Sequence, residues 1–453
     1  MRITPIIFII SALQILSSQS VADYKKEADA IIEASLKDIS TYERLAELCD
    51  TFGPRFSGSQ NLEDAIDWIL EEMKQDGLYN VHGEEVTVPH WVRGKESAEL
   101  IEPHRKNLNM LGLGGSIATP RTGIRAEVLV VKNFDELEAR KEEAKGKIVL
   151  FNAPFTTYGE TVQYRYRGAP AAAKAGAVAS LIRSVGPYSM DTPHTGVMAY
   201  EENVRKIPHA AITVEDAMML QRIQDRGQKI VVKLQMSAKM LPDAISRNVV
   251  AEIRGSEKPE EVVVIGGHID SWDVGQGAMD DAGGCVVAWD ALNVINNLGL
   301  KPKRTIRCVM WTNEENGLGG AKAYRDAHMN ELDNHVLAVE SDAGVFAPKG
   351  FGFSGSPEAL KIIREIGKLL EPIGAGKIRD GGGGADIGPM KPYGVPLAGL
   401  NVDGSRYFWY HHTHADMMDK LNPDEVNRCK AAMAVLAYVV ADMPQKLPRV
   451  IPE

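Results

Sequence analysis

The C-terminal half of the chain alternates short apolar runs with segments of helical periodicity. The apolar runs are rich in Val and Ile, as in residues 262–267 and 305–311, and helical segments such as 284–298 separate them. Strands that are apolar throughout are buried on both faces, and intervening helices supply the crossovers that parallel strands require. We therefore predict an α/β fold with a mixed, largely parallel sheet flanked by helices. The predicted elements here are strands 248–254, 262–267, 305–311, 336–341 and 395–400, and helices 284–298, 321–328, 357–370 and 423–443.

A different pattern occupies residues 116–242. It consists of the short strand-like runs AEVLVV, KIVLF, AITV and KIVVKLQM with one Ala-rich helical stretch, APAAAKAGAVASLIR. Pro and Gly turns bound this block, and the strand–helix alternation resumes at Arg247. We predict an inserted α/β domain at 116–242, which interrupts a larger domain made of residues 21–115 and 243–453. The first part of that larger domain has helical periodicity at 23–50 and up to Met73, then strand-like runs at 81–91, 97–101 and 108–113.

The first 20 residues, MRITPIIFIISALQILSSQS, have the pattern of a signal peptide. Arg2 precedes an apolar core at residues 6–16, and the small residues Ser18 and Ser20 suit a cleavage site. This predicts a secreted protein or one in the lumen of the secretory pathway or lysosome. The chain is 453 residues long with a net charge of −10 and has no basic stripe, which argues against nucleic-acid binding. Its four cysteines could form disulfides in that compartment, but we favour free buried thiols, since Cys285 and Cys308 lie in apolar runs.

Acidic and histidine side chains gather where the predicted strands end. His268 and Asp270 follow VVVIGG, Glu314 and Glu315 lie in MWTNEENGLGG, and Asp342 follows VLAVES. The stretch YHHTHADMMDK follows the strand near residue 400. Ligands of open α/β sheets bind at the carboxyl ends of strands. One acidic strand end is an ordinary solvated turn, but four in one sheet predict a converging site.

The chemistry of this set favours metal ions over a bare acid–base pair. Crowded carboxylates raise one another's pKa unless cations compensate their charge, and imidazole with carboxylate is a usual zinc ligand set. If His268, Asp280, Glu315, Asp342 and a histidine of HHTH are ligands, three negative carboxylates face the four positive charges of two zinc ions. The remaining positive charge favours a bound hydroxide. Glu314 is then left as a candidate general base.

Five motifs resemble the co-catalytic dizinc exopeptidases of the aminopeptidase/glutamate-carboxypeptidase family: GPRFSGS, GGHIDSWDVGQGAMDDAGG, TNEENGLGG, ESDAG and FWYHHTHADMMD. The similarity covers nearly the whole mature chain. It implies that His268 and Asp342 bind one zinc, that Glu315 and His412 bind the other, and that Asp280 bridges both. His412 is preferred to His414 because the family pattern H-T-x-x-D matches from His412 to Asp416.

The same resemblance implies roles for residues around the ligands. Glu314 matches the catalytic carboxylate, and Asp270 matches the acid that orients the first ligand imidazole. Many relatives have Tyr immediately before the second ligand histidine, where this chain has His411, so His411 or Tyr410 is the expected oxyanion donor. A cis peptide bond is expected after Asp280, and the inserted block resembles a protease-associated domain.

The function implied is that of a secreted dizinc exopeptidase cleaving dipeptides or short peptides. A metal-bridging water would attack the peptide carbonyl with Glu314 as general base. Carboxypeptidase or dipeptidase action is favoured, with an aminopeptidase or another amide-processing enzyme as the alternative. A catalytically silent binding ectodomain ranks last, since such relatives lose metal ligands and this chain has every one of them. The resemblance also implies a homodimer without a membrane span.

Overall fold

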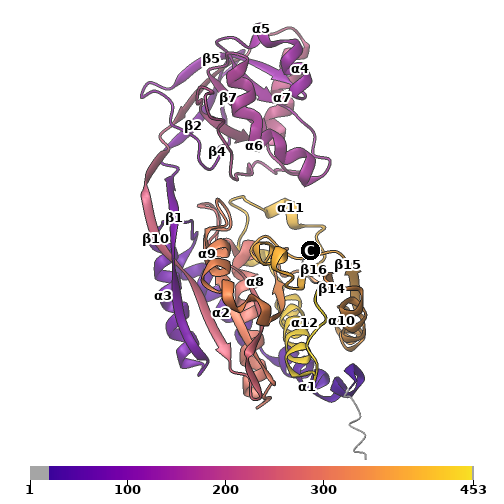
Figure 1. Ribbon diagram of the computed structural model, residues 1–453. Helices are drawn as coiled ribbons and strands as arrows, with labels where there is room; N and C mark the ends of the chain where they lie inside the picture. The colour runs from indigo at the N-terminus through magenta and orange to yellow at the C-terminus, as the bar shows by residue number, and fades with distance from the viewer. Residues whose placement is uncertain (1–19, 451–453) are drawn as a thin grey trace, which may run out of the picture.

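The computed structural model describes residues 20–450, and two eight-stranded sheets form its frame (Figure 1). The predicted leader, residues 1–20, lies outside the described part except for Ser20. The first sheet has the order β1-β10-β12-β11-β13-β16-β14-β15. Its centre is parallel, through β12 (Arg304–Trp311), β11 (Lys258–His268), β13 (His335–Glu340) and β16 (Leu397–Val402). Antiparallel neighbours flank this centre, namely β1 (Tyr79–Val92) with β10 (Lys239–Ile253) on one side and β14 (Pro348–Ser354) on the other, with β15 (Lys377–Asp380) at the edge. The predicted fold class, with its mixed and largely parallel sheet, is confirmed.

Helices pack around the first sheet and give it its main hydrophobic core. The long C-terminal helix α12 (Pro423–Asp442) packs against α8 (Gly283–Asn297), and both are almost wholly buried. Asn422 caps α12 by accepting hydrogen bonds from the N–H groups of Asp424 and Glu425, and Pro423 suits the first helical turn. The remaining helices around this sheet are α1 (Lys25–Lys37), α2 (Ser40–Phe52), α3 (Gln60–Gln75), α9 (Gly319–Ala327) and α10 (Pro357–Leu369).

The helical periodicity predicted at residues 23–50 corresponds to two helices, because the chain breaks between α1 and α2. Asp38 has an extended backbone there, with ψ of 121°. Its carboxylate accepts a hydrogen bond from the N–H of Ser40 at 2.8 Å and pairs with Lys430 at 2.7 Å. The hydrogen bond from Ser40 to the Asp38 side chain therefore favours a new helix starting at Ser40. The ion pair with Lys430 fixes the segment between the two helices against α12.

The second sheet has the order β3-β2-β9-β5-β6-β7-β8-β4. Its parallel core comprises β5 (Ile124–Val131), β6 (Ile148–Phe151), β7 (Ala179–Arg183) and β8 (His209–Ile212). The other strands are β2 (Glu96–Glu102), β3 (Lys106–Leu108), β4 (Met110–Gly112) and β9 (Val231–Met236), and the helices are α4 (Phe134–Ala139), α5 (Lys141–Ala144), α6 (Tyr158–Lys174) and α7 (Val214–Asp225). We call residues 96–236 the second-sheet unit.

Two features of this unit differ from the sequence-based expectation. The Ala-rich helix was expected to continue to Arg183, but it ends at Lys174, and Gly176 turns the chain with φ of 81° into the buried strand β7. Strands β2, β3 and β4 precede the predicted boundary at residue 116, yet β2 pairs with β9 and β4 with β8. The domain limits themselves stay a prediction.

A long antiparallel ribbon joins the two units. Strands β1 and β10 pair from Tyr79 with Glu252 to Val92 with Lys239, and they run along one side of the molecule from the first sheet to the second-sheet unit (Figure 1). The short helix α11 (Tyr407–Tyr410) lies between the two units, where Tyr158 stacks on Phe408 with ring centroids 5.2 Å apart. No helix formed by residues 20–450 is both long enough and apolar enough to cross a membrane. All four cysteines are free and buried, as favoured from the sequence.

Candidate active site

Neighbouring parallel strands bring the predicted acidic clusters to one edge of the first sheet. His268 is the last residue of β11 and lies opposite Trp311, the last residue of β12. Glu314 and Glu315 follow β12, and Asp342 follows β13, the neighbour of β11 on its other side. The predicted convergence of strand ends is therefore seen in the structure.

The two carboxylate oxygens of Asp280 face two separate clusters. Oδ1 lies 3.3 Å from Nε2 of His268, and the same nitrogen lies 3.3 Å from Oδ1 of Asp342. Oδ2 lies 3.4 Å from Nε2 of His412, which in turn lies 3.0 Å from Oε2 of Glu315. The structure thus brings together all five predicted metal ligands, with Asp280 shared between two histidine–carboxylate groups.

The donor set fits divalent cations. Two ligand atoms bound ~2.1 Å from one tetrahedral zinc lie about 3.4 Å apart, which matches the separations in both clusters. Oδ2 of Asp280 and Oε1 of Glu315 are buried without a hydrogen-bond partner among the described residues. Burial, and then the Asp280 charge, raise the pKa of Glu315 well above its ordinary value. Buried oxygens with this much unpaired acceptor capacity are suited to metal coordination.

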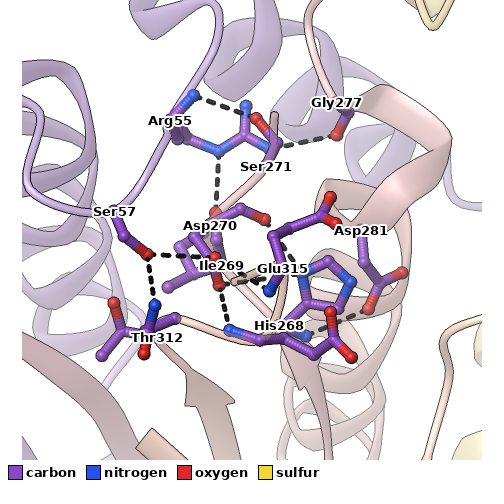
Figure 2. Close-up of polar contacts among 12 residues, drawn as sticks. Arg55, Ser57, His268, Ile269, Asp270, Ser271, Gly277, Asp281, Thr312 and Glu315 are labelled. Atoms are coloured by element: carbon purple, nitrogen blue, oxygen red, sulfur yellow. Dashed lines mark hydrogen bonds and ion pairs between the residues drawn. The ribbon is translucent and has the colours of Figure 1, made fainter. Parts of the chain in front are cut away.

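A backbone carbonyl orients His268. Its Nδ1 donates a hydrogen bond to the carbonyl of Asp270 at 2.9 Å, which leaves the Nε2 lone pair toward Asp280 and Asp342. The Asp270 carboxylate, predicted to orient this ring, lies 3.8 Å from Nδ1. That carboxylate instead accepts hydrogen bonds from the N–H groups of Glu314 at 2.9 Å and Glu315 at 3.3 Å (Figure 2). The Asp270 carboxylate therefore fixes the backbone that follows β12. The resemblance implied that this carboxylate orients His268, but the structure shows that the backbone carbonyl of Asp270 does so.

A buried arginine fixes the loop that carries Asp280. The Arg55 guanidinium donates to the carbonyls of Ile269 at 3.0 Å and Gly277 at 3.0 Å (Figure 2). It also donates to the carbonyl of Gln276 at 2.7 Å. Two residues on, Ser57 donates to the Asp270 carboxylate at 3.3 Å. We call residues 269–282, between β11 and α8, the acidic loop. The GPRFSGS motif therefore has a physical role, because it holds both ends of this loop.

Two further aspartates shape the backbone at Asp280. Asp281 accepts hydrogen bonds from the N–H groups of His268 at 3.1 Å and Gly284 at 3.0 Å. Asp416, the last residue of the H-T-x-x-D pattern, accepts from the N–H groups of Met279 at 2.8 Å and Asp280 at 3.2 Å. A Cβ at Gly284 would collide with the Asp281 carboxylate, which explains a glycine there. The predicted cis peptide bond between Asp280 and Asp281 is present.

Glu314 lines an open cavity and, unlike Glu315, forms no ion pair with a histidine among the described residues. The cavity has a volume of about 440 Å³ and also exposes Asp280, Glu315, Asp342 and His412. Burial first, and then the charges of Asp342, Asp270 and Asp280, raise the pKa of Glu314 to about 8. A carboxylate whose pKa lies near neutrality is suited to accept and return a proton. Bound cations would lower this value by compensating the neighbouring charges.

The structure adds residues that the sequence reasoning missed. Tyr407, one helical turn before His411, lines the cavity, and Tyr410 does not, although both tyrosines pack against the main core. Tyr158 and Arg165 reach the cavity from α6 of the second-sheet unit. The four-residue spacing of Tyr407 and His411 was the one sequence pattern that could have indicated Tyr407. No sequence pattern connected α6 with the metal ligands.

The three histidines of HHTH have different surroundings. His411 stacks on His412 with ring centroids 3.5 Å apart and lies 3.7 Å from Oδ2 of Asp280. Its Nδ1 has no partner among the described residues, whereas Nδ1 of His412 lies 3.3 Å from the carbonyl of Thr195. Ligand histidines almost always donate this outer hydrogen bond, which favours His412. His414 is exposed and belongs to neither cluster.

Comparison with known proteins agrees with this geometry. Residues 248–437 match the model of peptidase family M28. The chain is 51% identical to mouse carboxypeptidase Q over 434 residues, which is 95% of this chain and 92% of the relative, and 53% identical to the human protein over 409 residues, 90% and 87% of the two chains. The crystal structure of a peptidase M28 precursor from Shewanella amazonensis superposes with a TM-score of 0.91 at 36% identity, covering 96% of this chain and all of the other.

The chain therefore belongs to peptidase family M28, and its fold and site are those of a metallo-exopeptidase. Within the family, the resemblance of the motifs to carboxypeptidase Q, also called plasma glutamate carboxypeptidase, is confirmed.

Proposed function

We propose that this protein is an exopeptidase with two zinc ions per chain that hydrolyses dipeptides or short peptides. His268 and Asp342 would hold one ion, Glu315 and His412 the other, and Asp280 both. The observation that carries this proposal is that the two oxygens of Asp280 face two separate clusters at 3.3 and 3.4 Å. A carboxylate that served a single ion would not need both of its oxygens aimed at different histidines.

Of the two ends of a peptide substrate, we favour recognition of the C-terminus, that is, carboxypeptidase or dipeptidase action. The relatives with half their sequence in common are named carboxypeptidase Q, and the alignment spans almost their whole length. The cavity of about 440 Å³ has Tyr158 and Arg165 on the side of the second-sheet unit, and a cavity of this size suits short substrates. Arg165 forms no ion pair with a described carboxylate, so it supplies a positive charge near the otherwise acidic cavity. These features rank aminopeptidase or other amide-processing action second, and a silent binding role third.

Different residues of the site would carry proton transfer and stabilisation of the oxyanion. Bound zinc ions would act as Lewis acids toward the substrate carbonyl and lower the pKa of a water. Glu314 takes the proton from the attacking water and returns it to the leaving amine, a role that contributes typically ~10²–10⁴-fold. The Tyr407 hydroxyl or the His411 imidazole donates to the developing oxyanion. Of these two, Tyr407 is favoured because burial and the charges of Asp280, Asp342 and Glu315 raise its pKa well above the ordinary value, so it keeps its proton.

The leader-like residues 1–20 support entry into the secretory pathway, with secretion or a lysosomal lumen as the destination. A homodimer is proposed from the family resemblance alone. Analytical ultracentrifugation of the mature chain tests the dimer.

One experiment tests the activity and its polarity together. Zinc content per chain is measured in the active enzyme, and free, N-acetylated and C-amidated forms of one dipeptide are assayed with and without a chelator. We expect two zinc ions, loss of hydrolysis on chelation, cleavage of the free dipeptide and no cleavage of the C-amidated form. Retained cleavage of the N-acetylated form would assign carboxypeptidase action, and its loss dipeptidase action. Cleavage of the C-amidated but not the N-acetylated form would establish aminopeptidase action instead. An active enzyme with one ion or none would contradict the proposal.

A further inference from the structure

A loop of the second-sheet unit contacts the backbone and the ring of His412. Thr195 lies between β7 and β8, and its carbonyl is 3.3 Å from Nδ1 of His412. The N–H of Thr195 donates to the carbonyl of His412 at 2.9 Å. His412 has φ of 59°, a left-handed conformation that non-glycine residues rarely adopt. Both bonds therefore hold a strained residue from the opposite unit.

The ring contact has a chemical consequence. A histidine whose Nδ1–H donates to a carbonyl is fixed in the tautomer that presents a free Nε2 lone pair. In His412 that atom faces Glu315 at 3.0 Å and Asp280 at 3.4 Å. Nδ1 of His412 also lies 3.4 Å from a guanidinium nitrogen of Arg165, but that nitrogen donates to the Thr195 carbonyl at 3.3 Å. The shorter contact, from Nδ1 to the carbonyl of Thr195, therefore sets the tautomer and the rotation of the ring.

Thr195 is itself anchored through its side chain. Its hydroxyl donates to the carbonyl of Gly112 at 2.9 Å and accepts a hydrogen bond from Arg93 at 3.2 Å. Arg93 is almost buried and binds the Asp273 carboxylate through two hydrogen bonds of 2.8 and 2.5 Å. Arg93 directly follows β1, and Asp273 belongs to the acidic loop after β11. A continuous set of contacts therefore runs from the acidic loop, through the joint between the two units, to the ring of His412.

We infer that Thr195 is a positioning residue for His412 and that the Arg93–Asp273 ion pair holds Thr195 in place. The second-sheet unit, besides covering the cavity, then completes one of the two metal sites. This inference rests on the proposed function, since it takes His412 to be a zinc ligand. A simple packing role for the same contacts would stabilise the fold without changing affinity for metal.

The test compares zinc affinity with fold stability in four variants. Thr195→Val removes the anchoring hydroxyl at nearly constant size, and Thr195→Ser restores it. Asp273→Asn weakens the pair with Arg93. Glu127→Gln is the matched control, because Glu127 pairs with Lys147 at 2.8 Å in the same unit. Zinc affinity of each mature chain is measured by competition with a chelator, and the unfolding temperature is measured without metal.

We expect Thr195→Val and Asp273→Asn to weaken the binding of one zinc ion by about 10-fold, the lower end of the effect of losing an outer hydrogen-bond partner, because the Thr195 carbonyl is loosened and not removed. Thr195→Ser and Glu127→Gln should bind both ions as the parent does. Parent-like affinity in Thr195→Val and Asp273→Asn, even with a lowered unfolding temperature, would overturn the inference. If Thr195→Val fails to fold, Asp273→Asn carries the test alone, because this side chain is 25% exposed.

His412→Ala separates this inference from the proposed function. Loss of one zinc ion in His412→Ala with parent-like binding in Thr195→Val would contradict only the positioning role of Thr195. Retention of two ions in His412→Ala would contradict the ligand assignment itself, and with it the proposed dizinc centre.

Discussion

Glu314 and Glu315 are consecutive in the chain, but their carboxylates have different surroundings. Oε2 of Glu315 lies 3.0 Å from Nε2 of His412, inside one of the two clusters. Glu314 forms no ion pair with either histidine and lines the cavity, where burial and neighbouring carboxylates raise its pKa to about 8. The loop after β12 thus supplies one residue suited to hold metal and one suited to carry a proton.

Replacement of each glutamate by glutamine should separate these roles. Glu314→Gln should retain both zinc ions and lose turnover by about 10²–10⁴-fold, since only the proton carrier is removed. Glu315→Gln should lose zinc first, because a neutral amide replaces a charged ligand. Metal content by mass spectrometry and turnover of one dipeptide check both statements. Equal metal content and equal residual activity in the two variants would show that the roles are misassigned.

The donor to the oxyanion is tested by a pair of tyrosines in one short helix. Of the two, only Tyr407 lines the cavity, although both pack against the core, so Tyr407→Phe and Tyr410→Phe remove hydroxyls with different surroundings. Loss of one oxyanion donor lowers kcat by about 10²–10³-fold, and we expect this for Tyr407→Phe with little change in KM. Tyr410→Phe should keep parent-like kcat. If instead His411→Gln alone lowers kcat, the imidazole is the donor.

The convergence of these side chains could be predicted from the sequence because the predicted metal ligands lie in short motifs, most of them at strand ends. His268, Glu315 and Asp342 could be placed from the order of apolar strands alone, since parallel neighbours end at one edge. The bridging role of Asp280 and the choice of His412 within HHTH needed the family resemblance. Thr195 and Arg165 could not be predicted, because their contacts depend on how two units pack, and neither periodicity nor motif spacing encodes that packing.

The fold shows the same division between local and long-range information. The apolar runs of β11 and β12 were found within a few residues, since such runs suit buried strands. The sequence predicts a helix at β7 because ASLIR continues an Ala-rich sequence. The structure has a strand there, because Gly176 turns the chain and the segment pairs with β6 and β8. The edge strand β15 is short and polar, so it had no periodicity to detect.

A buried histidine far from the metal ligands should make stability depend on pH. Nδ1 of His335 donates to the carbonyl of Glu331 at 3.1 Å, and its Nε2 accepts from the Tyr324 hydroxyl at 3.0 Å. Burial first, and then the charges of Arg307 and His328, lower the pKa of His335 to about 4. The unfolded chain therefore binds the proton more readily than the folded one. Stability from this group is complete above pH ~6.5 and is lost as the pH falls through 6.5 toward 4, by about 3 kcal/mol at most.

Urea unfolding between pH 7.5 and 4.5 in the presence of a chelator measures this effect. His335→Gln should be less stable than the parent at pH 7.5, because the glutamine packs less well in a site shaped for imidazole. The difference between the two proteins should then shrink as the pH falls, since only the parent has the His335 imidazole to protonate, while the other buried histidines are common to both. Parallel pH profiles for the two proteins would contradict the assignment of a neutral His335.

The last prediction concerns Arg55, whose side chain is wholly buried and faces only carbonyl oxygens. Its guanidinium donates to the carbonyls of Gly53, Ile269, Gln276 and Gly277. Arg55→Met removes these bonds and leaves the acceptors buried, and hydrogen bonds from a charged group contribute ~1.5–3 kcal/mol each. We expect a loss of at least about 3 kcal/mol in the free energy of unfolding, together with weaker zinc binding, because the released loop carries Asp280. Arg247→Met is the control: that arginine pairs with Glu63 and Asp67 at the surface, and its loss should change stability by about 1 kcal/mol or less with no change in zinc affinity. Equal effects of the two substitutions on both quantities would show that Arg55 does not fix the acidic loop.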